Sequence, residues 1–233
     1  MGLDFTRCFE YLATMQELDL NSKPKVLDVG SSWSPFPLYL CAKGAQVFLS
    51  DLAEDKICKQ KRYSRQVGLE EKWEKGLANV IIQDATTLAL ENDLFDYVLC
   101  ISTIEHFPGD GDSEAVRELA RVLKSGGRLI LSVPYGQDYS EGRWPPFFQR
   151  TYDYANLRER LIEPSTLRLV RLEFFIDHAT RRFTDILYYR LPKYLRLSLG
   201  WAQLPWALRY LERDKANKDD AWVAWILLEK EVR

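Results

Sequence analysis

Short apolar runs alternate along the chain with longer segments in which apolar residues recur at helical spacing. The run at 95–102 is almost entirely apolar, as expected for a parallel strand that is covered on both faces. We expect strands at 25–29, 47–50, 79–83, 95–102, 128–133, 169–176 and 222–228, and helices at 3–20, 35–43, 54–67, 113–123 and 152–162. This alternation predicts an α/β fold with a doubly wound, mostly parallel sheet in a single domain over residues 1–233.

The first strand, turn, helix and second strand form a unit suited to a nucleoside. The strand ends at Gly30, where the chain can turn without a Cβ clash. Ser34 is expected to cap the next helix, with Pro35 in its first turn and Gly44 at its end. Asp51 ends the second strand, 21 residues after Gly30, and an acid there can accept hydrogen bonds from both hydroxyls of an adenosine ribose.

Other predicted strands end in similar residues. In doubly wound sheets, ligands bind beyond the carboxyl ends of the strands, near the switch in strand order. The residues expected at that edge are Gly30, Asp51, Asp84, Ser102 and Pro134. Further along, Asp112 or Ser113 is expected to cap the helix that runs to Leu123, and Gly126-Gly127 to end it. The shared positions of the strand ends favour a binding site over simple strand termination.

Composition and charge narrow the functional classes. A net charge of −2 gives no reason to expect nucleic acid as a partner. The four cysteines are far apart, and Cys41 and Cys100 lie in apolar segments, so we expect reduced core thiols and no metal site. Residues 2–10 carry charge, unlike a signal peptide, and no apolar run approaches the ~18 residues that span a bilayer. A cytoplasmic protein is expected.

Several motifs occur together in an informative order. They are Val26-Leu-Asp-Val-Gly30, Asp51, Gln83-Asp84-Ala85, the segment from Phe95 to His106, and the segment from Glu118 to Pro134. With these motifs the chain resembles the class I S-adenosylmethionine-dependent methyltransferases over nearly its whole length. The resemblance implies a Rossmann-like fold of seven strands with helices on both faces and an antiparallel last strand. A weaker similarity, to the branch that modifies small molecules and sugars in bacterial polysaccharide pathways, rests on 34–37 and 149–153.

The resemblance also implies a cofactor site whose contacts follow the strand ends. It assigns the methionine part of S-adenosylmethionine to Asp28, Gly30 and Ser31, the ribose to Asp51, the adenine to Leu52, Asp84 and Ala85, and the neighbourhood of the sulfonium to Ile101 and Ser102. A hydrogen bond from ribose or adenine to a charged acceptor contributes about 1.5–3 kcal/mol.

One motif departs from the family pattern. Ser32 and Ser34 replace two glycines of the first turn, with Trp33 between them. Trp33 could cover the methionine end of the site or pack on the leading helix. The turn does argue against a nicotinamide cofactor, whose pyrophosphate needs a glycine-rich turn that this chain lacks. It also keeps open a non-catalytic relative that uses the fold only for binding.

His106 is the first candidate for a catalytic base. It follows the fourth strand, where the transferred methyl group should point, and imidazoles ordinarily titrate near neutrality. Glu105 is an alternative base. His106 could instead orient a loop, and His178 is expected to be structural.

Two variable regions should select the acceptor. The loop at 135–154 combines aromatic residues with arginines, which suits sugar rings or an anionic acceptor and equally suits lid packing. The insertion at 179–220 has a basic and aromatic stretch, 181–213, which could form a lid, a homodimer contact or a membrane-surface contact. The overall expectation is methyl transfer to a small molecule or glycan, at oxygen. The rivals are a non-catalytic binding protein and a NAD-dependent oxidoreductase.

Overall fold

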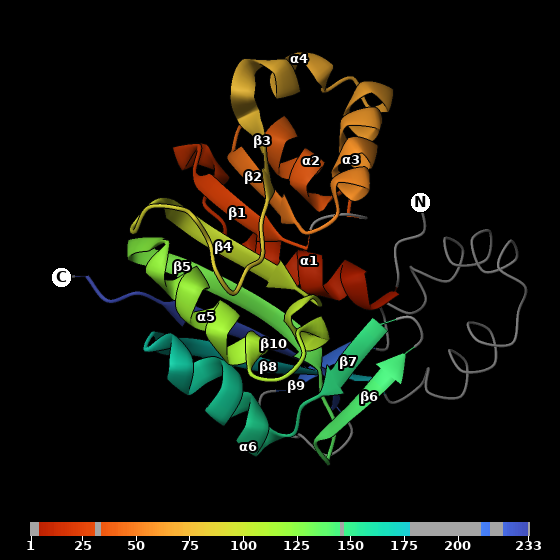
Figure 1. The fold of residues 1–233 in the computed structure, drawn as a ribbon, viewed down its shortest axis with the longest axis vertical. Helices are drawn as coiled ribbons and strands as arrows, with labels where there is room; N and C mark the ends of the chain where they lie inside the picture. Colours follow the sequence, from red (N-terminus) through yellow and green to blue (C-terminus); the bar gives the residue numbers. More distant parts are fainter. Residues whose placement is uncertain (1–4, 31–33, 145–146, 178–210, 215–220, 233) are drawn as a thin grey trace, which may run out of the picture.

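The computed structural model describes residues 5–30, 34–144, 147–177, 211–214 and 221–232. Its main sheet has the strand order β3-β2-β1-β4-β5-β10-β8-β9 (Figure 1). The strands are β1 (Lys25–Val29), β2 (Gln46–Asp51), β3 (Ala78–Ile82), β4 (Phe95–Ile101), β5 (Leu123–Pro134), β8 (Arg168–Asp177), β9 (Leu211–Asp214) and β10 (Ala221–Glu229). All seven predicted strands belong to this sheet, and the short edge strand β9 is an addition to them.

Strand direction follows the family pattern. β3, β2, β1, β4 and β5 pair in parallel, whereas β10 pairs antiparallel with both β5 and β8. The chain runs outward from β1 through β2 to β3 and then returns to place β4 on the other side of β1. The switch in strand order therefore lies between β1 and β4, and the candidate residues after those strands meet there.

Helices cover both faces of the sheet. The α-helices are α1 (Phe5–Glu17), α2 (Phe36–Ala42), α3 (Glu54–Gln66), α4 (Glu70–Lys72), α5 (Gly111–Arg121) and α6 (Tyr154–Leu157). Single 3₁₀ or π turns are η1 (Leu20–Ser22), η2 (Trp73–Leu77), η3 (Ile104–His106), η4 (Arg158–Ile162) and η5 (Glu163–Ser165). One core packs under α5 and α6, which lie in front of the sheet in Figure 1, and the other packs under α1 and α2.

The alternation of side chains along β10 divides these two cores. Val223, Trp225 and Leu227 pack into the core beneath α1 and α2. Ala224 and Ile226 point the other way, into the core beneath α5 and α6. A strand buried on both faces reads as a continuous apolar run, which is why the sequence identified it without a period of two.

Helix boundaries were predicted less well than strands. α5 begins at Gly111 after Asp110, and neither Asp112 nor Ser113 caps it. The Asp112 carboxylate is instead held by arginines from other segments, as described below. The helix also ends at Arg121, and Gly126-Gly127 lies inside β5, so the predicted glycine stop was wrong. Tertiary partners have overridden the local signals.

The first turn behaves nearly as expected. α2 begins at Phe36, one residue later than predicted, but the Ser34 Oγ accepts a hydrogen bond from the Phe36 N–H at 3.0 Å. Gly44 has φ +96°, as a left-handed residue after a helix requires. Cys41 and Cys100 are buried free thiols, as predicted.

Two features near the edge of the fold were not predicted as structure. Within the loop expected at 135–154, β6 (Ser140–Trp144) and β7 (Phe147–Thr151) form an antiparallel hairpin. The arrowhead of β4 points toward this hairpin in Figure 1. The predicted helix at 152–162 is shortened to α6 and continues as η4. His178 and most of the insertion at 179–220 lie outside the described residues. In the described part of the chain, no helix is long and apolar enough to span a bilayer.

Candidate active site

The turn after β1 requires a glycine. Gly30 has φ +73°, and its N–H donates to the Ser50 carbonyl oxygen at 2.8 Å. A Cβ at this position would lie 2.3 Å from the side chain of Thr103, the second residue after β4. The ends of β1 and β4 therefore meet closely at the switch point. Ser31 and Trp33 lie outside the described residues.

Asp28 lies within β1 beside this turn and is 5% exposed. Burial raises the pKa of its carboxyl to about 7, against the opposing effect of the Arg7 guanidinium. Arg7 comes from α1 and was not predicted as a site residue. Its guanidinium donates to the Ile101 carbonyl at 2.7 Å and the Ser102 carbonyl at 3.1 Å, so α1 is fixed over the end of β4.

Glu10 is a second contribution of α1 to this edge. Its side chain is fully buried, and its Oε1 accepts from the Ser102 Oγ at 2.6 Å and the Ser132 Oγ at 2.8 Å. These bonds hold Ser102 with φ +42°, a conformation that L-residues seldom adopt. The sequence signal that could have identified these two residues is an arginine and an acid three positions apart in the predicted leading helix.

Asp51 occupies the predicted position at the carboxyl end of β2. The residue is 9% exposed, and its Oδ1 accepts from the Ala53 N–H at 3.0 Å, which orients the side chain in the turn after the strand. The next residue, Leu52, is 65% exposed. A carboxylate acceptor next to an uncovered apolar side chain matches the two requirements of a nucleoside, which are ribose hydroxyl donors and a flat apolar base.

Asp84 and Ala85 follow β3. The strand ends at Ile82, one residue earlier than predicted, so Gln83 separates Asp84 from it. Asp84 is exposed, and its Oδ1 accepts from the Thr86 N–H at 2.9 Å and the Thr86 hydroxyl at 2.8 Å. Ala85 is buried. Asp84 therefore has a local role in its turn.

His106 and Glu105 lie together in η3, just beyond β4. The His106 Nδ1 is 2.7 Å from the carbonyl oxygen of Phe148 on β7, and its Nε2 is 3.9 Å from the Glu105 Oε1. His106 is 40% exposed, whereas Glu105 is buried and its Oε2 has no hydrogen-bond partner among the described residues. Burial raises the pKa of Glu105 to about 8.

Family and sequence comparisons agree on the class of the chain. The family described as a methyltransferase domain matches residues 27–131, which include β1 to β5 almost completely. Methyltransferase GfsG from Streptomyces halstedii is 34% identical over 118 residues, which is 50% of this chain and 40% of that protein. A ubiquinone biosynthesis O-methyltransferase from Xanthomonas euvesicatoria is 32% identical over 125 residues, covering 53% of this chain and 47% of the relative. The chain thus matches less than half of the length of these curated relatives.

Solved structures match almost the whole chain. A methyltransferase from Methanosarcina mazei has a TM-score of 0.64 at 17% identity and covers 95% of this chain and 98% of that one. The 1,6-didemethyltoxoflavin-N1-methyltransferase from Burkholderia thailandensis, solved with S-adenosylhomocysteine, has a TM-score of 0.62 at 15% identity and covers 97% and 78%. These likenesses confirm the Rossmann-like fold. The match of residues 27–131 to the methyltransferase domain and the methyltransferases among the sequence relatives support the resemblance of this chain to the class I S-adenosylmethionine-dependent methyltransferases.

Proposed function

We propose that the protein transfers a methyl group from S-adenosylmethionine to an oxygen atom of a small-molecule or glycan acceptor. The observation that carries this proposal is the placement of His106 at the carboxyl edge of the sheet, with its ring held through Nδ1. The family defines the cofactor, and the residues at the strand ends support its place.

The described residues fit this cofactor. The Asp51 and Asp84 carboxylates are acceptors for ribose hydroxyls and the adenine amino group, and Leu52 offers exposed apolar surface between them in the chain. Asp28 and Gly30 border the position proposed for the methionine part, together with Ser31, whose structure lies outside the described residues. Ile101 and Ser102 lie at the end of β4, where we expect the sulfonium.

The bound cofactor would supply an activated methyl group, whose transfer is an in-line displacement. The task left to the protein is to position the acceptor and to take the proton of its hydroxyl. A carbonyl oxygen cannot donate, so the contact with Phe148 requires a proton on the His106 Nδ1. In the neutral ring the lone pair then lies on Nε2, the atom that we assign as the proton acceptor.

The buried environment of Glu105 separates it from this role. Its carboxyl pKa is raised to about 8, so at neutral pH it carries a proton and cannot accept another. His106 is therefore proposed as the base, and Glu105 as a neutral acid beneath it. Glu105 becomes a competent acceptor only in alkaline solution.

The proposed class of acceptor rests on the names of the relatives and on the composition of the segment at 135–154. O-methylation agrees with the name of the ubiquinone biosynthesis relatives, and the aromatic and basic segment at 135–154 suits sugar rings or an anionic acceptor. A place in polysaccharide biosynthesis, in the cytoplasm, remains part of the proposal. A membrane-surface or homodimer contact through 181–213 also remains part of the proposal. Only 211–213 of that stretch belong to the described residues.

The test combines a binding measurement with an acceptor screen. The purified chain is incubated with labelled S-adenosylmethionine and sugar, phenol and lipid-linked acceptors, and methylated products are detected by mass spectrometry. His106→Gln should lower turnover by about 100-fold or more while leaving S-adenosylhomocysteine affinity unchanged. His178→Gln is the matched control. Equal turnover in His106→Gln and the unsubstituted chain would refute the assignment of the base.

A further inference from the structure

One buried arginine, Arg150, joins the β6–β7 hairpin to the loop after β4. Arg150 lies on β7, and its side chain is fully buried. Its Nη1 donates to the Phe107 carbonyl at 2.5 Å and lies 3.0 Å from the Asp112 Oδ2, while Nη2 donates to the Gly109 carbonyl. Its Nε donates to the Glu141 Oε1 at 2.9 Å. Each nitrogen of the guanidinium therefore has a partner.

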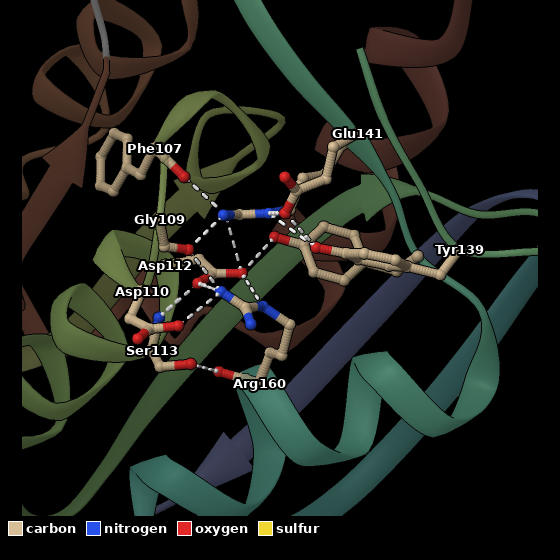
Figure 2. Close-up of polar contacts among 10 residues, drawn as sticks. Phe107, Gly109, Asp110, Asp112, Ser113, Tyr139, Glu141 and Arg160 are labelled. Atoms are coloured by element: carbon tan, nitrogen blue, oxygen red, sulfur yellow. Dashed lines mark hydrogen bonds and ion pairs between the residues drawn. The ribbon is translucent and has the colours of Figure 1, made fainter.

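Asp112 is the buried counter-charge of this arginine. It is fully buried, and it also binds Arg160, whose Nε is 2.9 Å from Oδ2 and whose Nη2 is 2.7 Å from Oδ1. The Tyr152 hydroxyl donates to Oδ2 at 2.9 Å. A buried charge is tolerated only when it is paired and hydrogen-bonded, and this carboxylate meets both conditions. The cluster fixes β7, the start of α5 and η4 relative to one another (Figure 2).

The same two segments are tied a second time at His106. Phe148, whose carbonyl faces the His106 Nδ1, is two residues before Arg150 on β7. Phe107, whose carbonyl accepts from Arg150, directly follows His106. The histidine contact therefore lies beside the Arg150 contacts on both segments. If Arg150 released the loop, the ring would lose the fixed approach of its carbonyl partner.

We propose that Arg150 is a positioning residue that holds His106 in the Nδ1–H tautomer. The arginine does not touch the acceptor; it sets the distance between β7 and the loop that carries the histidine. A planar guanidinium presents five donors on three nitrogens in fixed directions, whereas a lysine ammonium has three rotatable donors on one nitrogen. Its relevance to catalysis rests on the function proposed above, in which Nε2 accepts the proton.

The tautomer is measured directly by nitrogen-15 NMR of the full chain labelled at histidine. The chain has only two histidines, so His178→Gln assigns both signals. We expect the Nδ1–H form of His106 in the unsubstituted protein. In Arg150→Met the ratio of Nδ1–H to Nε2–H should fall about fivefold or more, the effect of one net hydrogen bond. In Arg150→Lys this ratio should lie between those of the unsubstituted protein and Arg150→Met.

The control is Arg158→Met, which removes an arginine whose side chain is 49% exposed, from the nearby turn η4. It should leave the His106 ratio unchanged. If Arg150→Met does not fold, the double variant Arg150→Met/Asp112→Asn removes both members of the buried pair, and Arg160, which also binds Asp112, keeps its contacts with Asp110 and the Gly109 carbonyl. Circular dichroism identifies the folded variants. A folded variant lacking Arg150 with an unchanged tautomer ratio would overturn the proposal.

Calorimetry with S-adenosylhomocysteine on the same samples separates this inference from the proposed function. A lost tautomer preference with S-adenosylhomocysteine binding retained supports the positioning role as described. A lost preference in a chain that never binds S-adenosylhomocysteine would support the positioning role and refute the cofactor site. The two failures therefore have different signatures.

Discussion

Glu105→Gln should change how stability depends on pH. Glu105 is 2% exposed in η3, and its pKa is raised from 4.5 to about 8 because burial disfavours the charged form. At neutral pH the folded chain therefore keeps a proton that the unfolded chain releases. Glutamine has nearly the same shape and no titrating proton, so the substitution removes this linkage.

The sign and size follow from proton binding. Because the folded pKa lies above the unfolded one, the stabilisation is complete below about pH 4.5 and is lost as the pH rises through about 8. One proton difference changes the free energy of unfolding by about 1.4 kcal/mol per pH unit. Between about pH 5.5 and about pH 7.5, Glu105 should therefore cost the unsubstituted protein ~2–3 kcal/mol. Asp28, with its pKa raised to about 7, adds a slope of the same sign that remains in the variant.

Urea unfolding across this pH range measures the effect. The stability of Glu105→Gln should be flatter with pH, with the difference between the two proteins changing by about 2 kcal/mol. Glu163→Gln is the matched control, because its side chain is 59% exposed and water reaches it in both states. Parallel pH dependence in Glu105→Gln and the unsubstituted chain would refute the reasoning about this buried acid.

Three further substitutions test the site. Gly30→Ala should destabilise the fold by about 2 kcal/mol or more in urea unfolding, because the added Cβ would collide with the Thr103 side chain. The control Gly68→Ala, with φ +71° and no atom within 4 Å of the added Cβ, should cost about 1 kcal/mol, and equal losses in the two variants would contradict this reasoning. Asp51→Asn should weaken S-adenosylhomocysteine about tenfold in calorimetry, and Asp55→Asn on exposed α3 should not; unchanged affinity in the first would reject the ribose contact. Arg7→Met should lower the free energy of unfolding by about 3 kcal/mol, because the buried Glu10 carboxylate loses its ion-pair partner and the Ile101 and Ser102 carbonyls lose this donor. A loss below about 1 kcal/mol would contradict that role.

The strands could be predicted because each is a local signal. β1, β2, β4 and β10 are mostly apolar runs bounded by turn residues, and most of their side chains are buried on both faces of the sheet. The antiparallel direction of β10 came from the family resemblance and was confirmed. Strand order and pairing are properties of the whole sheet, so they could not be obtained from any single segment.

The start of α5 shows why other boundaries failed. Asp112 has the residue type and position of a helix cap, but its carboxylate binds Arg150 and Arg160, which are far along the chain. The hairpin containing Arg150 was missed for the same reason. Its strands are short and mix polar with aromatic residues, and contacts with the loop after β4 hold it in place. Local sequence contains no record of such distant partners.

The candidate site divides in the same way. Gly30 and Asp51 could be predicted because a tight turn and a strand-ending acid are local features, and the structure has both at the expected edge. Arg7 and Glu10 were missed because they act on the end of β4, more than ninety residues away. His106 was selected by its position after the fourth strand and by its residue type, and only the structure supplied the carbonyl contact that defines its tautomer.

Calorimetric titration of the full chain with S-adenosylmethionine, S-adenosylhomocysteine and NAD tests the cofactor site most directly. We expect micromolar binding of the first two ligands, weakened by Asp51→Asn, and no heat from NAD. Binding of NAD, or no binding of either methionine-derived ligand, would contradict the assignment of the strand edge as the cofactor site.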